Sequence, residues 1–245
     1  FSTNRLLSGN IPAGKPSFSV KGDIPNPGLY LGETLYRQLS DSSLNVGQVE
    51  TTYNKYYDEM HQKTKTSFDE EVFYIHKSYL LSDIITNTNF KSNNHYAEHL
   101  IRTIGRTKNQ DIYTSALKLG IEKTNEFWKT KGLSTTSLTM FDGSGLSPSN
   151  SVSPSFMCDL LVYMQTKSNY PKAFLESLPK AGKEGTVSSR LRGTRLAGKI
   201  YMKSGSIFGV QCFAGYYIDG NKKYAFTIMI NKFNGQRSQI TQGID

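Results

Sequence analysis

The sequence predicts an α/β (α+β) fold in which an antiparallel sheet packs against helices. Three extended runs rich in β-branched and aromatic residues follow one another closely, at 199–204, 210–218 and 224–231. Asp219-Gly220 separates the last two runs and is a strong hairpin signal. Three strands with such tight connections form an antiparallel meander. The amphipathic stretches that precede them supply the helical layer.

The first 90 residues offer a mixture of signals. Residues 1–22 alternate in the manner of strand and turn, and the Pro-Asn-Pro run at 25–27 predicts a helix start, because proline suits a first helical turn. Residues 47–70 are polar and aromatic. Helical packing or an irregular excursion explains their tyrosines more simply than a ligand-stacking surface does. Residues 72–76 predict a strand, and 80–88 predict a helix-like stretch.

The second part of the chain is rich in helix signals. Ser92-Asn93-Asn94 precedes an amphipathic helix that is expected to end at Gly105. A Gly/Ser-rich loop at 142–147 is not a phosphate-binding loop, because no Gly-Lys-Ser/Thr follows it. Further helices are expected at 111–131, 155–166 and 171–178.

Composition limits the class of protein. The 245 residues suffice for one large or two small domains, and 37% hydrophobic content is compatible with a folded chain. No run approaches 18 apolar residues, so no transmembrane helix is expected. The start at Phe1 lacks a signal-peptide pattern and suggests a fragment or a processed chain. The net charge of +9 is spread along the sequence without a nucleic-acid motif, which favours solvated surface and no nucleic-acid partner.

The two cysteines do not form a metal motif. Cys158 lies in an apolar helical stretch and Cys212 in an apolar strand, and neither belongs to a Cys-x-x-Cys pair. Buried free thiols are therefore expected rather than a disulfide or a zinc knuckle.

One tripeptide on the first predicted strand suggests a ligand site. Lys203-Ser204-Gly205 places a cation suited to a carboxylate beside a hydroxyl group and a glycine. The glycine allows a ligand backbone to approach the strand closely. The tripeptide alone is a weak signal. Likewise, Ser92-x-Asn94 before a helix fits ordinary N-capping as well as it fits a catalytic motif.

Several motifs taken together, in type, order and spacing, resemble a known family. The chain is similar to the second half of penicillin-binding protein 4-type D-alanyl-D-alanine carboxypeptidase/endopeptidases. The motifs that carry this resemblance are Ser92-x-Asn94-x-Tyr96-Ala97-Glu98, Asp142-Gly-Ser-Gly-Leu-Ser147, Ala181-Gly182-x-x-Gly185-Thr186 and Lys203-Ser204-Gly205.

The resemblance implies a fold and a division of the chain. The fold is the penicillin-binding/serine β-lactamase-like transpeptidase fold, incomplete in this chain. Residues 1–22 resemble the exit of a large inserted region, and 23–245 resemble the C-terminal half of the acyltransferase domain. Most of the C-terminal helix that closes the family's sheet is expected to be missing.

The resemblance also implies roles for six residues. A serine attacks the bond between two D-alanines, and water resolves the acyl-enzyme. Ser92 relays a proton to the leaving amine, Asn94 holds the substrate amide, and Lys203 supports the proton network. The substrate's carboxylate and backbone are received by Ser204 and Gly205, and the backbone N–H of Ser206 is one oxyanion donor.

The nucleophile is the main departure from the family pattern. Two Ser-x-x-Lys strings begin at Ser115 and Ser177, and both follow the Ser-x-Asn motif, which is the wrong order. Ser115 is expected in mid-helix, and a proline interrupts the second string. The chain therefore looks like a fragment without its nucleophile and its base lysine.

Two other classes compete with this interpretation. The His95-x-x-Glu98-His99 string matches an inverted zinc-protease motif, with two histidines on one helix face and Glu98 as base. No third ligand is evident, so no metal is expected. The other alternative is a binding module with the penicillin-binding fold and no chemistry.

The implied substrates are peptidoglycan peptides, and β-lactam antibiotics are the implied inhibitors. No cofactor is required, and the sequence does not decide whether the protein forms a homo-oligomer. Such an enzyme belongs in the periplasm or cell envelope, outside the cytoplasm.

Overall fold

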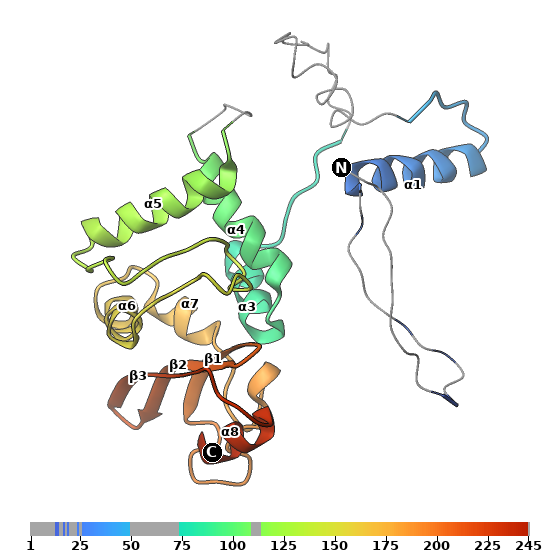
Figure 1. Cartoon of the computed structure of the whole chain (residues 1–245). Coiled ribbons are helices and arrows are strands. Elements are labelled where there is room, and N and C mark those ends of the chain that lie inside the picture. Colours follow the sequence, from blue (N-terminus) through green and yellow to red (C-terminus); the bar gives the residue numbers. More distant parts are fainter. Residues whose placement is uncertain are drawn as a thin grey trace. The chain divides into compact units, whose positions relative to one another are not determined.

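A computed structural model (Figure 1) describes residues 26–49, 74–108 and 114–244, together with five isolated positions before residue 26. The chain divides into two units, 1–75 and 76–245. The predictions for 1–22 and 47–70 lie almost entirely outside the described residues. In the described part, no helix is long and apolar enough to cross a membrane.

The first unit contains helix α1, Pro27–Asp41. The Asn26 side chain caps its start by accepting a hydrogen bond from the Leu29 N–H at 3.0 Å, and Pro27 occupies the first helical position. The helix start predicted from the Pro-Asn-Pro run is therefore confirmed.

In the described part of the second unit, a series of α-helices precedes the sheet (Figure 1). They are α3 (Leu81–Lys91), α4 (Asn94–Arg106), α5 (Ala116–Thr130), α6 (Pro154–Thr166) and α7 (Pro171–Glu176). The predicted strand at 72–76 is wrong where the structure describes it, since 74–76 have no regular structure. Tyr74 and Ile75 are 72% and 73% exposed, so these residues have no packed face that would stabilise a strand.

Helices α4 and α5 pack through two glycines. A Cβ atom on Gly105 would lie 1.9 Å from the carbonyl oxygen of Ala116, and one on Gly120 would lie 2.0 Å from that of Ile101. Helix α4 ends at Arg106, one residue after the predicted end at Gly105, and Gly105 also permits the close contact with α5. Helix α5 begins later than predicted because Ser115 caps it.

The predicted meander is confirmed. Strands β1 (Ile200–Ile207), β2 (Val210–Asp219) and β3 (Lys222–Asn231) form an antiparallel sheet in that order. The Asp-Gly turn joins β2 to β3, with Gly220 at φ 59°. Strand β1 lies at an edge of this sheet, with Lys203 opposite Ala214.

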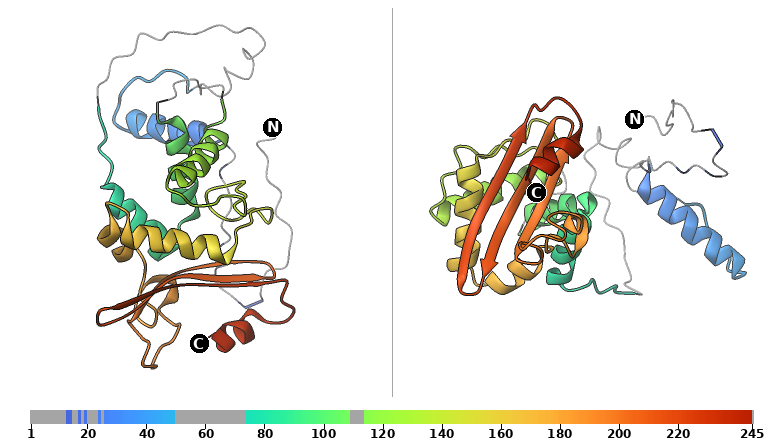
Figure 2. Two further views of the ribbon diagram at one scale, coloured as in Figure 1. Left: turned by 90° about the vertical axis from the view of Figure 1, so that its left-hand side faces the viewer. Right: turned by 90° about the horizontal axis from the view of Figure 1, so that it is seen from below.

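Each face of the sheet has its own cover (Figure 2). Helix α6 covers one face, where the Tyr216 hydroxyl donates a 2.6 Å hydrogen bond to the Leu161 carbonyl. Loop 179–198 covers the other, burying Val187 against Met202 and Phe213. Helix α8 (Arg237–Ile244) lies on the loop side. Since side chains alternate along a strand, Lys203 points to the helix side.

The cysteines fit the expectation of free thiols, although both are half-buried rather than buried. Cys158 and Cys212 are unpaired. The Cys158 thiol donates to the Thr227 hydroxyl over 3.5 Å, which joins α6 to β3.

Candidate functional site

The connection between α3 and α4 separates the capping role from the predicted site residues. Asn93 is the N-cap of α4, and its side chain accepts a hydrogen bond from the Tyr96 N–H at 3.1 Å. Ser92 is the C-cap of α3 in the left-handed region, with φ 51°. Asn94 is the first residue of α4. The side chains of Ser92 and Asn94 are therefore available for a role other than N-capping.

Lys203 reaches this connection from the sheet. Its Nζ atom donates to the Ser92 Oγ at 2.9 Å and also to the carbonyl oxygen of Ser204. Burial lowers the pKa of the Lys203 amine, because the charged form loses solvation there. The half-buried amine thus joins strand β1 to the α3–α4 connection.

A cleft of about 490 Å³ surrounds this contact. Its walls come from the α3–α4 connection, the loop 143–146, Thr186 and residues 203–207 of β1. All six predicted site residues line it, namely Ser92, Asn94, Lys203, Ser204, Gly205 and Ser206. Segments that are far apart in sequence thus meet in one concave surface.

The strand side of the cleft is open to a ligand. A Cβ atom on Gly205 would meet nothing within 4 Å. The Ser204 hydroxyl lies 3.3 Å from that of Thr186, and Gln211 donates to the Gly205 carbonyl at 3.2 Å. Thr186 therefore adds a second hydroxyl beside that of Ser204, a role that the sequence interpretation did not assign.

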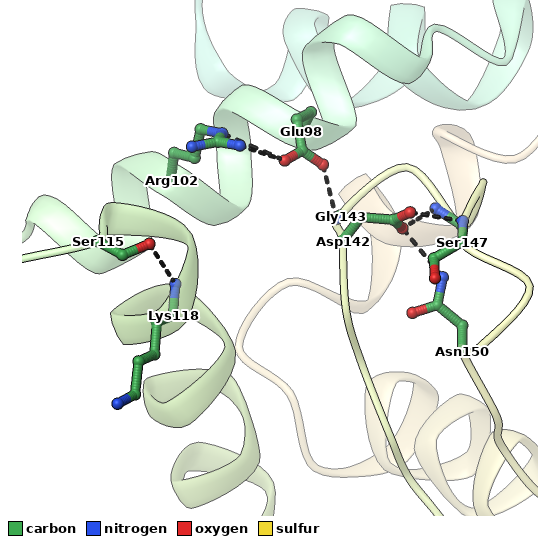
Figure 3. A network of polar contacts seen from close by, with 9 residues as sticks. Glu98, Arg102, Ser115, Lys118, Asp142, Gly143, Ser147 and Asn150 are labelled. Carbon is green, nitrogen blue, oxygen red and sulfur yellow. Dashed lines mark hydrogen bonds and ion pairs between the residues drawn. The ribbon is translucent and has the colours of Figure 1, made fainter.

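The loop wall is held by Asp142 (Figure 3). Its carboxylate accepts from the N–H groups of Gly145 and Ser147, each at 2.6 Å, and from the Asn150 amide at 3.0 Å. Burial acts to raise the pKa of Asp142, but the hydrogen bonds outweigh it and the pKa is lowered. Asp and Gly are typical residues of such turns, so the Asp-Gly-Ser-Gly run in the sequence is a signal for the turn that Asp142 holds.

Neither rejected serine belongs to the cleft. Ser115 is not in mid-helix as predicted but is the N-cap of α5, where its Oγ accepts from the backbone N–H of Lys118 at 3.3 Å (Figure 3). Ser177 is 1% exposed and donates to the Phe174 carbonyl at 2.7 Å. Both hydroxyls have structural partners.

The zinc-motif residues show a different arrangement from the one the motif predicts. The Glu98 carboxylate accepts from the Gly143 N–H at 2.8 Å and from Arg102 at 2.9 Å. The His95 and His99 rings lie edge to face, 4.3 Å apart. Within the described ranges, three or more His, Cys, Asp or Glu side chains do not cluster in a way that could hold a metal.

An antiparallel sheet packed on helices, with a Ser–Lys contact at their junction, has the architecture of the penicillin-binding fold. A structure of penicillin-binding protein 4 from Haemophilus influenzae, complexed with a β-lactam, matches with a TM-score of 0.76 and 25% identity. The match covers 92% of this chain and 51% of that one. The predicted fold class is thereby confirmed.

The chain belongs to the D-Ala-D-Ala carboxypeptidase 3 (S13) family, whose model matches residues 1–245. A D-alanyl-D-alanine carboxypeptidase from an Actinomadura strain is 34% identical over 173 residues, covering 68% of this chain and 31% of that protein. A penicillin-sensitive carboxypeptidase A from Dictyostelium discoideum is 29% identical over 67% of this chain and 33% of that protein. The chain spans about a third of the length of these relatives. The predicted resemblance is confirmed.

Proposed function

We propose that this chain forms one side of the active site of a serine-type D-Ala-D-Ala carboxypeptidase/endopeptidase that acts on peptidoglycan stem peptides. The hydrogen bond between Lys203 and Ser92 in a polar cleft carries this proposal. Burial lowers the pKa of the Lys203 amine, and the amine is hydrogen-bonded to the Ser92 hydroxyl. Such a hydrogen-bonded pair can pass a proton from one group to the other. Family membership supports the reaction type.

The reaction is acyl transfer. A serine Oγ attacks the carbonyl carbon of the penultimate D-Ala, and the C–N bond to the terminal D-Ala breaks. Ser92 passes a proton to the leaving amine, with Lys203 as its partner in the network. Asn94, at the start of α4, holds the substrate amide. Water then cleaves the ester and regenerates the serine.

The strand β1 binds the end of the substrate. The hydroxyl of Ser204 and the charge of Lys203 receive the terminal carboxylate, and the open space at Gly205 lets the peptide backbone lie against the strand. The backbone N–H of Ser206 is one oxyanion donor. Loss of such a donor typically costs about 3 kcal/mol of transition-state stabilisation.

The nucleophile and its base lysine are proposed to lie outside these 245 residues. Ser115 and Ser177 are both occupied by structural hydrogen bonds, and neither lines the cleft. The chain covers about a third of its curated relatives, which leaves ample length for a Ser-x-x-Lys segment elsewhere in the protein. The substrate class places the enzyme outside the cytoplasm, and β-lactams would inhibit it.

Labelling with a fluorescent penicillin, read by intact mass, tests this function. We expect the full-length protein to gain one acyl adduct and the 245-residue chain to gain none. Absence of an adduct on both would favour a binding module without chemistry. An adduct on the 245-residue chain would contradict an external nucleophile and return Ser115 and Ser177 to consideration.

A further inference from the structure

Glu98 connects two walls of the cleft. One carboxylate oxygen accepts from the Gly143 N–H at 2.8 Å, and the other accepts from Arg102 at 2.9 Å (Figure 3). Helix α4 also carries Asn94 and Ala97, which line the cleft, while Gly143 begins the loop wall on the other side. The side chain therefore joins the helix of the predicted site to the segment that faces it.

The contact between this loop and α4 is close. A Cβ atom on Gly143 would lie 2.6 Å from the Ala97 carbonyl oxygen and 2.7 Å from the Ile101 Cγ2. Only a glycine fits there without movement of the helix or the loop. The hydrogen bond to Glu98 lies at this same residue, so it fixes the point at which the loop meets the helix.

Hydrogen bonds couple the rest of the loop to the position of Gly143. Asp142, next to it in sequence, binds the N–H groups of Gly145 and Ser147 at 2.6 Å. Asn150 ties Asp142 to the end of the loop at 3.0 Å. A shift at Gly143 would therefore carry Ser144, Gly145 and Leu146 with it.

We propose that Glu98 is a positioning residue that sets the loop wall against helix α4 and thereby sets the shape of the substrate cleft. This inference rests on the proposed function. It replaces the general-base role that the His-x-x-Glu-His string suggested. Glu98 makes no bond to Ser92 or Lys203, so its loss is expected to weaken binding and to leave the proton-transfer groups in place.

Three variants of the full-length protein separate this role from others. Glu98→Ala removes the acceptor for the Gly143 N–H. Glu98→Gln keeps an acceptor oxygen but loses the charge. Arg102→Gln removes the ion pair and leaves the Glu98–Gly143 bond intact. Penicillin acylation, followed over a range of concentrations, yields the dissociation constant of the first complex and the acylation rate constant for each variant.

We expect Glu98→Ala to raise the dissociation constant roughly tenfold and to change the acylation rate constant by less than about twofold, because loss of an interaction made equally in the ground state and the transition state weakens binding and leaves the rate constant unchanged. Glu98→Gln and Arg102→Gln are expected to resemble the wild type. A merely structural role would instead lower the fraction of protein that can be labelled, with an unchanged dissociation constant in the rest. That result would overturn the inference, as would equal defects in Glu98→Ala and Glu98→Gln.

Hydrogen exchange of the Gly143 amide tests whether Glu98 holds the loop in place, and this test does not require that any variant is acylated. Exchange is expected to accelerate at least tenfold in Glu98→Ala, with little change in Glu98→Gln or Arg102→Gln. An unchanged exchange rate in Glu98→Ala would contradict the inference. Absence of labelling in the wild type, together with accelerated exchange in Glu98→Ala, would refute the proposed function alone.

Discussion

The Nζ atom of Lys203 donates a hydrogen bond to the Oγ atom of Ser92 across 2.9 Å, although 111 residues separate them in sequence. One group comes from the edge strand of the sheet and the other from a left-handed residue between two helices. The helices must therefore be correctly packed against the sheet before this pair can form. The site is a product of the tertiary fold rather than of either segment alone.

Replacement of Lys203 by methionine is expected to abolish function without harming the fold. Methionine fills a similar space but cannot accept or donate the protons that the amine handles. Penicillin acylation of the full-length protein is expected to fall at least ~100-fold, as for loss of a general acid–base group. Thermal stability at neutral pH is expected to equal or exceed that of the wild type, because a buried cation no longer needs to be desolvated.

The pH dependence of stability tests whether burial of the Lys203 charge destabilises the wild type relative to Lys203→Met. Burial lowers the pKa of Lys203 in the folded state below its ordinary value of 10.5, so the unfolded chain binds the proton more tightly. The resulting destabilisation is complete below the folded-state pKa and is relieved as the pH rises toward 10.5. Any stability advantage of Lys203→Met should shrink between neutral and alkaline pH, as measured by thermal melts. A constant difference would contradict this cause.

Two substitutions at Ser92 separate its hydroxyl from its backbone. Ser92 has φ 51°, a left-handed conformation that costs non-glycine residues roughly 1–2 kcal/mol. Both Ser92→Ala and Ser92→Gly remove the partner of Lys203, so both are expected to lower acylation to a similar extent. Ser92→Gly is expected to be the more stable variant by about 1 kcal/mol in chemical denaturation. Wild-type acylation by either variant would exclude a role for the hydroxyl.

The sheet was predictable because its signals are local. Alternating residues and the Asp219-Gly220 turn specify the meander within about thirty residues, and Asn26 with Pro27 specifies the start of α1. The strand predicted at 72–76 is wrong in its described part for the opposite reason. A β-branched or aromatic run forms a strand only beside a partner strand, and the first described strand, β1, begins at Ile200, far from residues 72–76 in sequence.

The site was only partly predictable from the residues. Ser92 and Lys203 were brought together by family resemblance, since nothing local in either segment indicates the other. Glu98 lies 45 residues from Gly143, and its helical spacing from two histidines suggested a metal site instead. Side chains that act across tertiary contacts leave no periodic pattern, so a local motif can assign them the wrong partner.

Replacement of Asp142 by asparagine is expected to loosen the loop wall in a pH-dependent way. The carboxylate accepts two backbone N–H bonds and one from Asn150, and its folded-state pKa lies below the ordinary 3.8. This stabilisation is present above pH 3.8 and is lost as the pH falls through the lower folded-state pKa. Because solvent screens the group, the difference should be at most about 1 kcal/mol at neutral pH.

Thermal melts of wild type and Asp142→Asn between pH 2 and pH 7 provide the measurement. The two melting temperatures are expected to differ at pH 7 and to converge at the acidic end, where Asp142 is protonated. All other acidic groups are shared, so their contributions cancel in the comparison. Divergence toward acid would show that the carboxylate destabilises the loop, contrary to the hydrogen bonds that it accepts.

Two glycine substitutions in the cleft are expected to act in opposite ways. Gly205 faces open space, so a methyl group there costs the fold little but occupies the surface on which a substrate backbone would lie. Gly143 is packed against α4, and its Cβ would lie 2.6 Å from the Ala97 carbonyl oxygen. Overpacking of this kind costs roughly 1–3 kcal/mol.

Gly205→Ala is therefore expected to melt like the wild type and to lose penicillin acylation, whereas Gly143→Ala is expected to melt earlier. Melting temperature and acylation rate, measured on the same preparations of full-length protein, separate the two effects. Unimpaired acylation in Gly205→Ala would mean that the ligand does not lie against β1, and the assignment of Ser204 and Ser206 to substrate binding would fall with it. Loss of stability in that variant would instead mean that another part of the protein packs against Gly205.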